Sequence, residues 1–314
     1  MHAHAEHTHD HNDLFHNHAP TSQLRKALFL TISILIVEVA GGVLSHSLAL
    51  LSDAGHVLTD IAALCITWYT LNLSQKPPSA AMTFGYHRTG ILAALTNGVA
   101  LILIAILIGF EAYRRLLHPT PIVSGWMFVS AGFGLAVNLY LGLGLQTGDN
   151  LNLRGAWLHI LGDAAASAGV IVAGGLIDVT HIAAIDPILS VLIALLIAFG
   201  AWRLVRQTVN ILLEGTPKGV SYPAVERTIR AIPGVMDVHD LHVWCIASGR
   251  NALSCHVILE GRMTIRDSQA ILRQMEHALV HLGIGHVTIQ TEDAEHPHSD
   301  SILCCDDLPK RHVH

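Results

Sequence analysis

The chain has 314 residues, of which 51% are hydrophobic and only 13% are charged. Because an average soluble protein carries about 25% charged residues, this composition is atypical of one. The formal net charge of -6 argues against a nucleic-acid-binding protein, which would present a basic patch or stripe. The five cysteines lack framework spacing, which argues against a secreted disulfide scaffold, and histidine is in excess, with 23 His against 18 Lys and Arg.

The first 25 residues are polar, acidic and rich in histidine, and they lack the apolar stretch of a signal peptide. A segment this polar is unable to build a core, so we predict that residues 1–25 are flexible. Histidine-rich tracts indicate metal binding, although an incidental solvated tail would have the same composition. The histidines of this tract are His2, His4, His7, His9, His11, His16 and His18.

Charge is missing mainly from the middle of the chain. Residues 27–210 hold 15 Asp, Glu, Lys and Arg side chains in 184 positions, whereas residues 211–314 hold 22 in 104. A membrane-spanning helix needs about 20 predominantly apolar residues, and six runs meet this requirement, too many for a set of buried core helices. We therefore predict a six-helix transmembrane domain over residues 26–213. The predicted spans are Lys26–Ser45, Ala49–Leu73, Thr89–Leu117, Ile122–Leu145, Gly155–Val179 and Ile185–Ile211.

Basic residues are distributed unequally between the two ends of the predicted spans. Six spans place both termini on one side of the membrane, and only Arg114 and Arg115 fall on the other side. Because basic residues concentrate in cytoplasmic loops, we predict that both termini are cytoplasmic. The basic residues on the side of the termini are Arg25, Lys26, Lys76, Arg88, Arg154, Arg203 and Arg206.

From Glu214 onward the charge content is that of a soluble domain, and we predict an α+β fold over residues 214–293. Helical and strand-like apolar patterns follow one another in the order α-β-β-α-β, which suits a small open-faced sandwich. The predicted elements are a helix at Ser221–Ala231, strands at Val235–Ile246 and Ala252–Leu259, a helix at Thr264–Leu282 and a strand at Gly285–Glu292. Residues 294–314 have little apolar periodicity and are predicted to form a flexible tail.

Two spans carry the same pair of ionisable residues, four positions apart. The second span contains His56 and Asp60, and the fifth contains His159 and Asp163. Residues at i and i+4 share one helix face, so each pair presents an imidazole and a carboxylate together. Two such faces turned toward each other would supply the four ligands of a tetrahedral Zn²⁺ site. A single pair would more readily be a structural hydrogen bond, but its repetition in separate spans favours a metal site.

The composition of this ligand set favours transport over catalysis. All four ligands come from the protein, so no position remains for an activated water, as metal-assisted hydrolysis would require. Histidine exchanges protons near neutral pH, and metal and proton compete for the same nitrogen. A site with two histidines therefore has a physical basis for exchanging protons against a divalent cation.

Other polar residues inside the spans have less specific interpretations. Asp53 lies one turn before His56 and would support the metal ligands or line the mouth of the site. Glu38 and Asn138 would either line a hydrophilic pore or join helices by hydrogen bonds. Four further residues lie near span ends and require no special role: Glu111, His118, Asp178 and Asp186.

Four segments carry motifs of one known family: Leu48–Asp60, Phe84–Arg88, Asn152–Asp163 and Val238–Trp244. On these segments the chain resembles the cation diffusion facilitator family, most closely its zinc-transporting branch, from about Leu24 to Glu292. The resemblance implies a homodimer with six transmembrane helices per protomer and a C-terminal cytoplasmic ferredoxin-like domain. It also implies a transporter rather than an enzyme, which exports Zn²⁺ from the cytosol in exchange for protons by alternating access.

The resemblance also assigns metal-binding roles. His56, Asp60, His159 and Asp163 fall on the transport-site positions of the family. In the cytoplasmic domain, a zinc site would be formed by His239, His256 and a residue of the last strand, for which His286 and Glu292 are the candidates; ordinary strand residues are the alternative. Strand alternation predicts that His242 points to the face opposite His239.

Two further pairs match the family. Arg88 and Glu214 match a charge pair that joins spans 3 and 6, and we expect this pair to act as a hinge-like lock. Cys304 and Cys305 resemble tail thiols of some members, although their spacing differs, and thiolates favour zinc. The histidine-rich segment 1–25 would capture cytosolic zinc near the transport entrance.

Other functional classes fit the sequence less well. An intramembrane metalloprotease would need His-Glu-x-x-His, and a primary pump would need G-x-x-x-x-G-K-[ST] or Asp-Lys-Thr-Gly, and the sequence contains none of these motifs. A passive channel or a membrane-bound zinc sensor would tolerate the same ligands, and proton coupling separates both from an antiporter. Because no organelle signal is present, we expect a multi-pass protein of a prokaryotic plasma (inner) membrane whose partners are lipid, zinc and a second copy of the chain.

Overall fold

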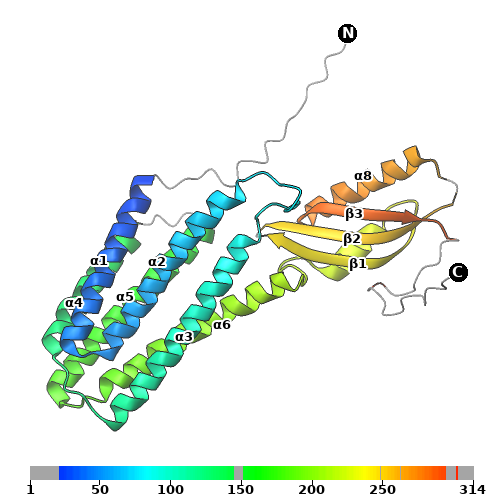
Figure 1. Cartoon of the computed structure of the whole chain (residues 1–314). Coiled ribbons are helices and arrows are strands. Elements are labelled where there is room, and N and C mark those ends of the chain that lie inside the picture. The colour runs from blue at the N-terminus through cyan, green and yellow to red at the C-terminus, as the bar shows by residue number, and fades with distance from the viewer. Residues whose placement is uncertain (1–20, 145–150, 248, 262, 295–301, 303–314) are drawn as a thin grey trace. The chain divides into compact units, whose positions relative to one another are not determined.

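The computed structural model of the chain describes residues 21–144, 151–247, 249–261, 263–294 and 302. Its six long helices are α1 (Thr21–Ser45), α2 (Leu48–Ser74), α3 (Thr89–Leu117), α4 (Ser124–Gly144), α5 (Leu151–Thr180) and α6 (Ile185–Leu212) (Figure 1). They are followed by α7 (Tyr222–Arg230), β1 (Val235–Ala247), β2 (Arg250–Leu259), α8 (Ile265–His281) and β3 (Ile284–Glu292). The chain divides into two compact units. The first unit contains the residues up to 65 together with residues 100–200, and the second contains residues 66–99 together with those from 201 onward.

Each of the six long helices is long and apolar enough to cross a membrane. Their surfaces expose large apolar side chains, such as Phe29, Leu143 and Phe199, which are 71%, 86% and 74% exposed. Soluble proteins rarely show such extensive apolar surface, whereas in a bilayer these side chains contact lipid. The prediction of six membrane-spanning helices is confirmed, and α1 begins earlier than predicted, at Thr21.

Small residues allow the helices of the first unit to approach closely. A Cβ atom on Gly41 of α1 would lie only 1.7 Å from Ser130 Oγ of α4. A larger residue at this crossing would force the two helices apart, which explains the preference for glycine at contacts between membrane helices. Next to this crossing, Ile34, Val57 and Val137 form a buried apolar cluster that joins α1, α2 and α4.

A buried carboxylate fixes the start of α2. Asp186, in the first turn of α6, accepts hydrogen bonds from the Ser47 hydroxyl and from the backbone N–H groups of Leu48 (2.7 Å) and Ala49 (3.3 Å). Backbone N–H groups at the start of a helix have no partner within it, so Asp186 caps α2 from another helix. The prediction that Asp186 requires no special role was wrong, because a cap that acts across 138 residues leaves no local sequence pattern.

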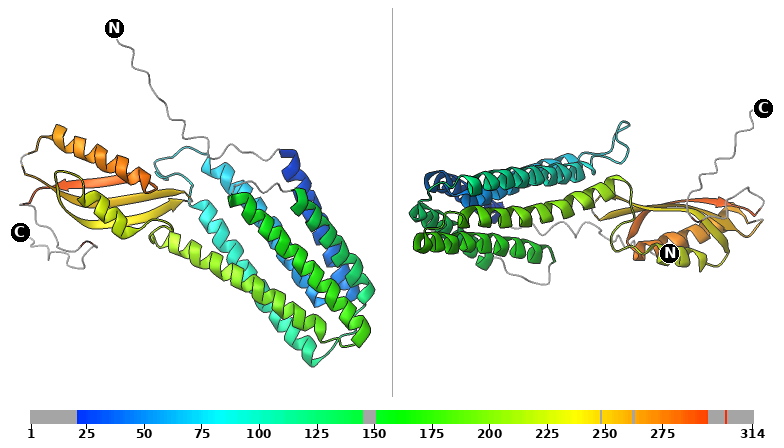
Figure 2. Two further views of the ribbon diagram at one scale, coloured as in Figure 1. Left: turned by 180° about the vertical axis from the view of Figure 1, so that it is seen from behind. Right: turned by 90° about the horizontal axis from the view of Figure 1, so that it is seen from below.

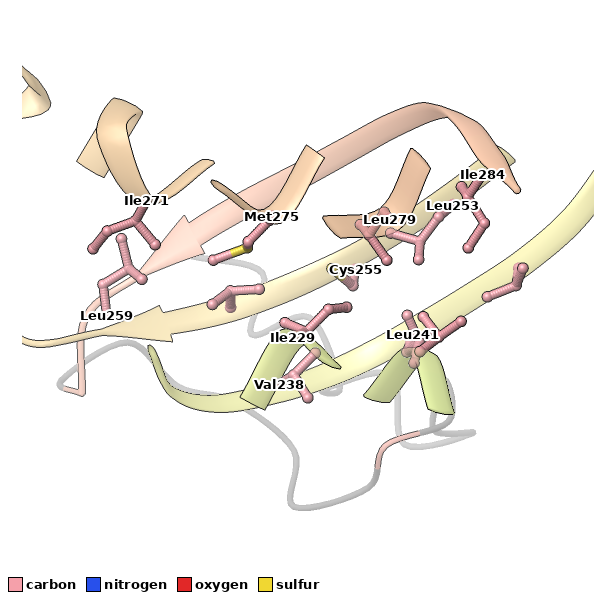
Figure 3. Close-up of a cluster of buried hydrophobic side chains, with 13 residues drawn as sticks. Ile229, Val238, Leu241, Leu253, Cys255, Leu259, Ile271, Met275, Leu279 and Ile284 are labelled. Carbon is pink, nitrogen blue, oxygen red and sulfur yellow. The ribbon is translucent and has the colours of Figure 1, made fainter. Parts of the chain in front are cut away.

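The C-terminal part of the second unit is a three-stranded sheet with helices on one face. The strand order is β1-β2-β3, with β1 and β2 antiparallel and β2 and β3 parallel. Both α7 and α8 pack on the same face of this sheet (Figure 2), which confirms the predicted α-β-β-α-β order and the open-faced sandwich. The core between helices and sheet includes Val225, Ile229, Val238, Leu241, Leu253, Cys255, Val257, Leu259, Ile271, Met275, Leu279 and Ile284 (Figure 3).

Local sequence signals explain where the two short helices begin. Pro223 lies in the first turn of α7, where its missing N–H costs no hydrogen bond. At the start of α8, the Thr264 hydroxyl accepts a hydrogen bond from the Asp267 N–H, and the Asp267 carboxylate accepts one from the Thr264 N–H. This reciprocal capping box satisfies two backbone donors at once and sets the start of α8.

Replacing the carboxylate that caps α2 tests its structural role. We expect Asp186→Ala to lower the free energy of unfolding by about 2 kcal/mol, because it leaves buried backbone donors of α2 without an acceptor. The matched control is Asp178→Ala, which removes an exposed carboxylate that accepts a hydrogen bond from Ser124. Thermal unfolding of the purified protein in detergent compares the variants, and equal unfolding temperatures for the two would contradict the cap.

Candidate metal centres

The two His-x-x-x-Asp pairs of the sequence meet in the first unit. His56 and Asp60 lie on one face of α2, and His159 and Asp163 lie on one face of α5. His159 Nε2 is 3.1 Å from Asp60 Oδ2 and 3.7 Å from Asp163 Oδ2. His56 Nε2 is 3.6 Å from Asp60 Oδ2 and 3.8 Å from Asp163 Oδ1. Each imidazole therefore faces both carboxylates, and we call these four residues the His-Asp cluster.

The spacing of the His-Asp cluster matches the requirements of a zinc ion. Nitrogen and oxygen ligands lie about 2.0–2.2 Å from Zn²⁺, which places adjacent corners of a tetrahedron about 3.3–3.6 Å apart. The four nitrogen–oxygen distances, from 3.1 to 3.8 Å, bracket this range. Atoms offered by His56, Asp60 and His159 all lie within 4.8 Å of one another, and Asp163 joins them through both histidines. Small side-chain adjustments would therefore suffice to bind a tetrahedral ion.

The His-Asp cluster is partly shielded and partly accessible. The side chains of His56, Asp60 and Asp163 are 18–24% exposed, whereas that of His159 is 49% exposed. His159 is thus the most accessible of the four side chains. Carboxylates inside a membrane domain are costly unless they are compensated, so such a group of residues indicates function.

Asp53 lies near the His-Asp cluster but faces other residues. It is 3% exposed, and its carboxyl group adjoins Glu38 of α1 and Ser167 of α5. Asp53 thus forms a buried carboxyl pair with Glu38, whose role the sequence left open between pore lining and helix association. Asp53 was predicted either to support the metal ligands or to line the mouth of the site. Its pair with Glu38 lies one helical turn from His56, and a supporting role stays a prediction.

A second group of possible ligands lies on the sheet face that α7 and α8 leave uncovered. His239 of β1 pairs with His256 of β2 across the two strands. Glu292, at the end of β3, places Oε1 2.9 Å from His256 Nδ1 and Oε2 3.3 Å from His239 Nε2. Atoms of the three residues lie within 4.8 Å of one another, and the side chains of His239 and Glu292 are buried. We call these three residues the sheet cluster.

A β-bulge beside the sheet cluster changes the direction of the following side chains. The pairing of β1 with β2 shifts between His239 and His242, and Asp240 has a φ of 50°. The extra residue of a bulge shifts the alternation by one, so Leu241 points into the core. His242 therefore shares the outer face with His239, and the prediction from simple alternation was wrong.

Asp240 is the residue that sequence reasoning missed here. Its Oδ1 is 3.0 Å from His242 Nε2 and its Oδ2 is 3.5 Å from His256 Nε2. Asp240 therefore extends the sheet cluster toward His242. The sequence offers one signal, an aspartate that lies between His239 and His242. Its significance becomes clear once the bulge at this position is known.

Of the two candidates in the last strand, the structure selects Glu292. His286 pairs with Ala252, whereas Glu292 pairs with Ile258. Six residues of an extended strand separate the two, which corresponds to about 20 Å. The ring of His286 instead lies 5.8 Å from that of Phe84. The prediction of His286 as a ligand is therefore corrected.

The described cysteines near the sheet cluster are poor candidates for metal ligands. Cys255 points into the core, and burial raises the pKa of its thiol to about 12. Only the thiolate binds metal, so this side chain remains protonated and inert at neutral pH. The predicted tail ligands Cys304 and Cys305, and the histidines of segment 1–25, lie outside the described residues.

The predicted charge lock is formed within the second unit. Arg88 Nη2 donates a hydrogen bond to Glu214 Oε1 at 3.1 Å. Glu214 lies two residues after the end of α6 and has a left-handed φ of 58°, which turns the chain away from the helix axis. The two side chains are 40% and 61% exposed, so the pair contributes only about 0–1 kcal/mol to stability. A contact this weak can open and close readily, as a hinge requires.

The sequence matches known proteins over both of its parts. The family model described as "Cation efflux transmembrane domain" matches residues 24–213, and "Cation efflux protein, cytoplasmic domain" matches residues 217–294. A "Cadmium, cobalt and zinc/H(+)-K(+) antiporter" of Bacillus velezensis is 42% identical over 308 residues, which are 95% of this chain and 98% of that protein. "Zinc transporter ZitB" of Escherichia coli (strain K12) is 41% identical over 295 residues, which are 91% of this chain and 92% of that protein.

A solved structure of the "Metal-bound C-terminal domain of the CzcD transporter from Cuprividus metallidurans" is 36% identical in sequence to the part of this chain that it matches. It covers 23% of this chain and 99% of its own, with a TM-score of 0.22. The two family models together span nearly all of the described residues, and the relatives match over almost their full lengths. The chain therefore belongs to the cation efflux family, the cation diffusion facilitators that its motifs resemble.

Proposed function

We propose that this protein exports Zn²⁺ from the cytoplasm in exchange for protons, as a homodimeric secondary transporter that works by alternating access. The observation that carries the proposal is the His-Asp cluster, in which two helices contribute one imidazole and one carboxylate each, at the spacing of a tetrahedral ion. The names of the relatives, a cadmium, cobalt and zinc/H(+)-K(+) antiporter and a zinc transporter, support zinc as a cargo and protons as a counter-ion.

Charge balance explains why metal and protons would alternate at the His-Asp cluster. Asp60 and Asp163 supply two negative charges, which Zn²⁺ neutralises when both imidazoles are neutral. Once the ion leaves, two uncompensated carboxylates inside the membrane domain would be strongly disfavoured. Protons bound at the vacated imidazoles restore neutrality, so an exchange of two protons for one Zn²⁺ keeps the charge of the cluster constant.

The direction of transport is inferred from the family, and the proposed topology is consistent with it. We place residues 26–213 in the membrane and residues 214–293 in the cytoplasm. The basic residues on the side of the termini support this orientation, and the bacterial relatives support an inner-membrane location. The half-exposed His159 is the ligand through which zinc would enter. Membership of the family supports the proposed homodimer and alternating access.

The sheet cluster would hold a second, regulatory zinc ion. Two imidazoles and one carboxylate provide three ligands within reach of one ion, and Asp240 lies 3.5 Å from the remaining nitrogen of His256. The buried carboxylate of Glu292 is already placed between the two histidines, which reduces the rearrangement that binding requires. Zinc bound at the sheet cluster would make the cytoplasmic domain, which adjoins the charge lock, sensitive to the concentration of cytoplasmic zinc.

Removing one carboxylate of the His-Asp cluster tests the proposed function. We expect Asp163→Ala to lower zinc flux by about 100-fold or more, because an anionic ligand is worth several kcal/mol to a bound cation. Zinc uptake into proteoliposomes, followed with a trapped zinc-sensitive dye, measures the flux. Asp178→Ala, on the same helix but near its exposed end, serves as the matched control. Normal transport by Asp163→Ala would show that the His-Asp cluster does not carry zinc.

The identity of the ligand at position 56 should set metal selectivity. We expect His56→Asp to retain flux but to loosen selectivity toward cadmium, cobalt and manganese, because a carboxylate is a harder and more permissive ligand than imidazole. Competition between zinc and each of these ions in the same proteoliposome assay measures the change. An unaltered preference for zinc in this variant would argue against His56 as a ligand.

The sheet cluster predicts a separate binding event. In an Asp163→Ala background, we expect zinc to remain bound, and the further change His239→Ala to weaken this binding by about 10–100-fold. Equilibrium dialysis of the purified full-length protein with metal analysis measures both. The matched control is His277→Ala, on the exposed face of α8. If His239→Ala and His277→Ala bound zinc equally well, the sheet cluster would be no zinc site.

A further inference from the structure

Two carboxyl groups lie buried beside the His-Asp cluster without belonging to it. Glu38 of α1 is 1% exposed and Asp53 of α2 is 3% exposed, and the two groups adjoin each other. Because α1 ends at Ser45 and α2 begins at Leu48, Glu38 lies about 10 Å and Asp53 about 8 Å from the turn between the helices. We call Glu38 and Asp53 the carboxyl pair.

In the described part of the chain, the surroundings of the carboxyl pair are polar, and the charged groups that act on it are acidic. A Cβ atom on Gly134 of α4 would lie 2.9 Å from Glu38 Oε1 and 3.2 Å from Ser167 Oγ, so this glycine leaves the space that both groups face. In the part of the chain that the structure describes, neither carboxyl oxygen of Glu38 has a well-formed hydrogen bond, and nor has the Ser167 hydroxyl. The charged groups that act on the pair from α2 and α5 are Asp60 and Asp163, which are acidic.

Two adjacent carboxylates in such surroundings are not both ionised. Burial disfavours each charged form, and repulsion between the two makes double ionisation still less favourable. Pairs of this kind hold one proton between them, as the catalytic dyads of some enzymes do. Among the described residues, Asp60 and Asp163 add to this repulsion, and one proton shared by the carboxyl pair would relieve it.

The location of the carboxyl pair connects it with the His-Asp cluster. Asp53 lies one helical turn before His56 on α2, and Ser167, which adjoins Asp53, lies one turn after Asp163 on α5. The pair therefore lies between the His-Asp cluster and the α1–α2 turn. In the proposed topology this turn is extracytoplasmic, the side from which protons enter an exporter. A serine hydroxyl both donates and accepts hydrogen bonds, so Ser167 can link the carboxyl pair with the His-Asp cluster.

We propose that Glu38 and Asp53 share one proton and deliver it to the His-Asp cluster as zinc departs. The inference rests on the proposed function. In this step the bond between zinc and an imidazole nitrogen breaks, an O–H bond of the carboxyl pair breaks, and an N–H bond forms on that imidazole. The carboxyl pair then takes up a proton from water on the extracytoplasmic side and repeats the step at the second imidazole, so that two protons enter for each Zn²⁺ that leaves and the charge of the cluster is conserved.

The relay is tested by separating proton-coupled transport from metal exchange. Full-length protein in proteoliposomes is assayed for net zinc uptake driven by a pH gradient, and for exchange of radiolabelled zinc against unlabelled zinc at equal pH, which requires no proton movement. We expect Glu38→Gln to exchange zinc at a rate within about twofold of the unaltered protein. Its net uptake should fall by at least about tenfold, because proton delivery becomes slow.

The matched control is Ser52→Ala, next to Asp53 in sequence. Ser52 is equally buried, but its hydroxyl donates only to the Leu48 carbonyl of its own helix, at 2.7 Å. We expect both assays to be unchanged in this variant. If Glu38→Gln fails to fold, as judged by gel filtration, Asp53→Asn is used with the same expectations, and Glu38→Asp should restore part of the net uptake.

The results for Glu38→Gln either support the relay or overturn it. Equal loss of exchange and net uptake in Glu38→Gln would assign Glu38 to the metal path or to folding and would overturn the relay. Unchanged net uptake would overturn it as well. If the unaltered protein neither exchanges nor accumulates zinc, the proposed function itself fails, and this result is distinguishable from failure of the relay alone.

Discussion

The structure depends on one electrostatic constraint: two carboxylates held inside an apolar helix domain must always be neutralised. Asp60 of α2 and Asp163 of α5 both lie near the imidazoles of His56 and His159, which in the described part of the chain are the basic groups paired with them. Neutral imidazoles leave two negative charges, which a divalent ion balances. Protonated imidazoles balance the same charge without metal. The chemistry of exchange is thus contained in the charge of four side chains.

The surrounding scaffold keeps these four side chains at a fixed depth. Asp186 caps the first turn of α2 from α6 and so holds the register of the helix that carries His56 and Asp60. The glycine of α1 at position 41 lets α4 approach, and Gly134 of α4 leaves room for Glu38. These contacts place the carboxylate of Asp186 where it caps α2, and those of Glu38 and Asp53 where they form the carboxyl pair.

Features encoded locally could be predicted from the sequence. The six spans follow from long apolar runs, the His-Asp cluster from a four-residue spacing repeated in two spans, and the sheet domain from its apolar periodicity. The start of α8 was marked by Thr264 and Asp267, which form a capping box. In each case, residues close in sequence provide the signal, although the two His-Asp pairs meet only because α2 and α5 pack together.

Features that depend on distant residues were missed. Asp186 caps a helix across 138 residues, and Glu38 meets Asp53 only when α1 and α2 pack together. The bulge at Asp240 reversed the expected direction of His242, because one inserted residue shifts strand alternation. The choice between His286 and Glu292 depended on the register of a parallel strand pair, which the sequence does not display.

The most direct test of the account measures zinc and protons together. Proteoliposomes that contain the full-length protein, a lumenal zinc dye and a lumenal pH dye are exposed to external zinc, with and without an acidic lumen. Exchange at the His-Asp cluster predicts that zinc entry raises the lumenal pH in step, and that an acidic lumen accelerates zinc entry. Zinc entry with no change in lumenal pH, at a rate that an imposed pH gradient leaves unaltered, would contradict it.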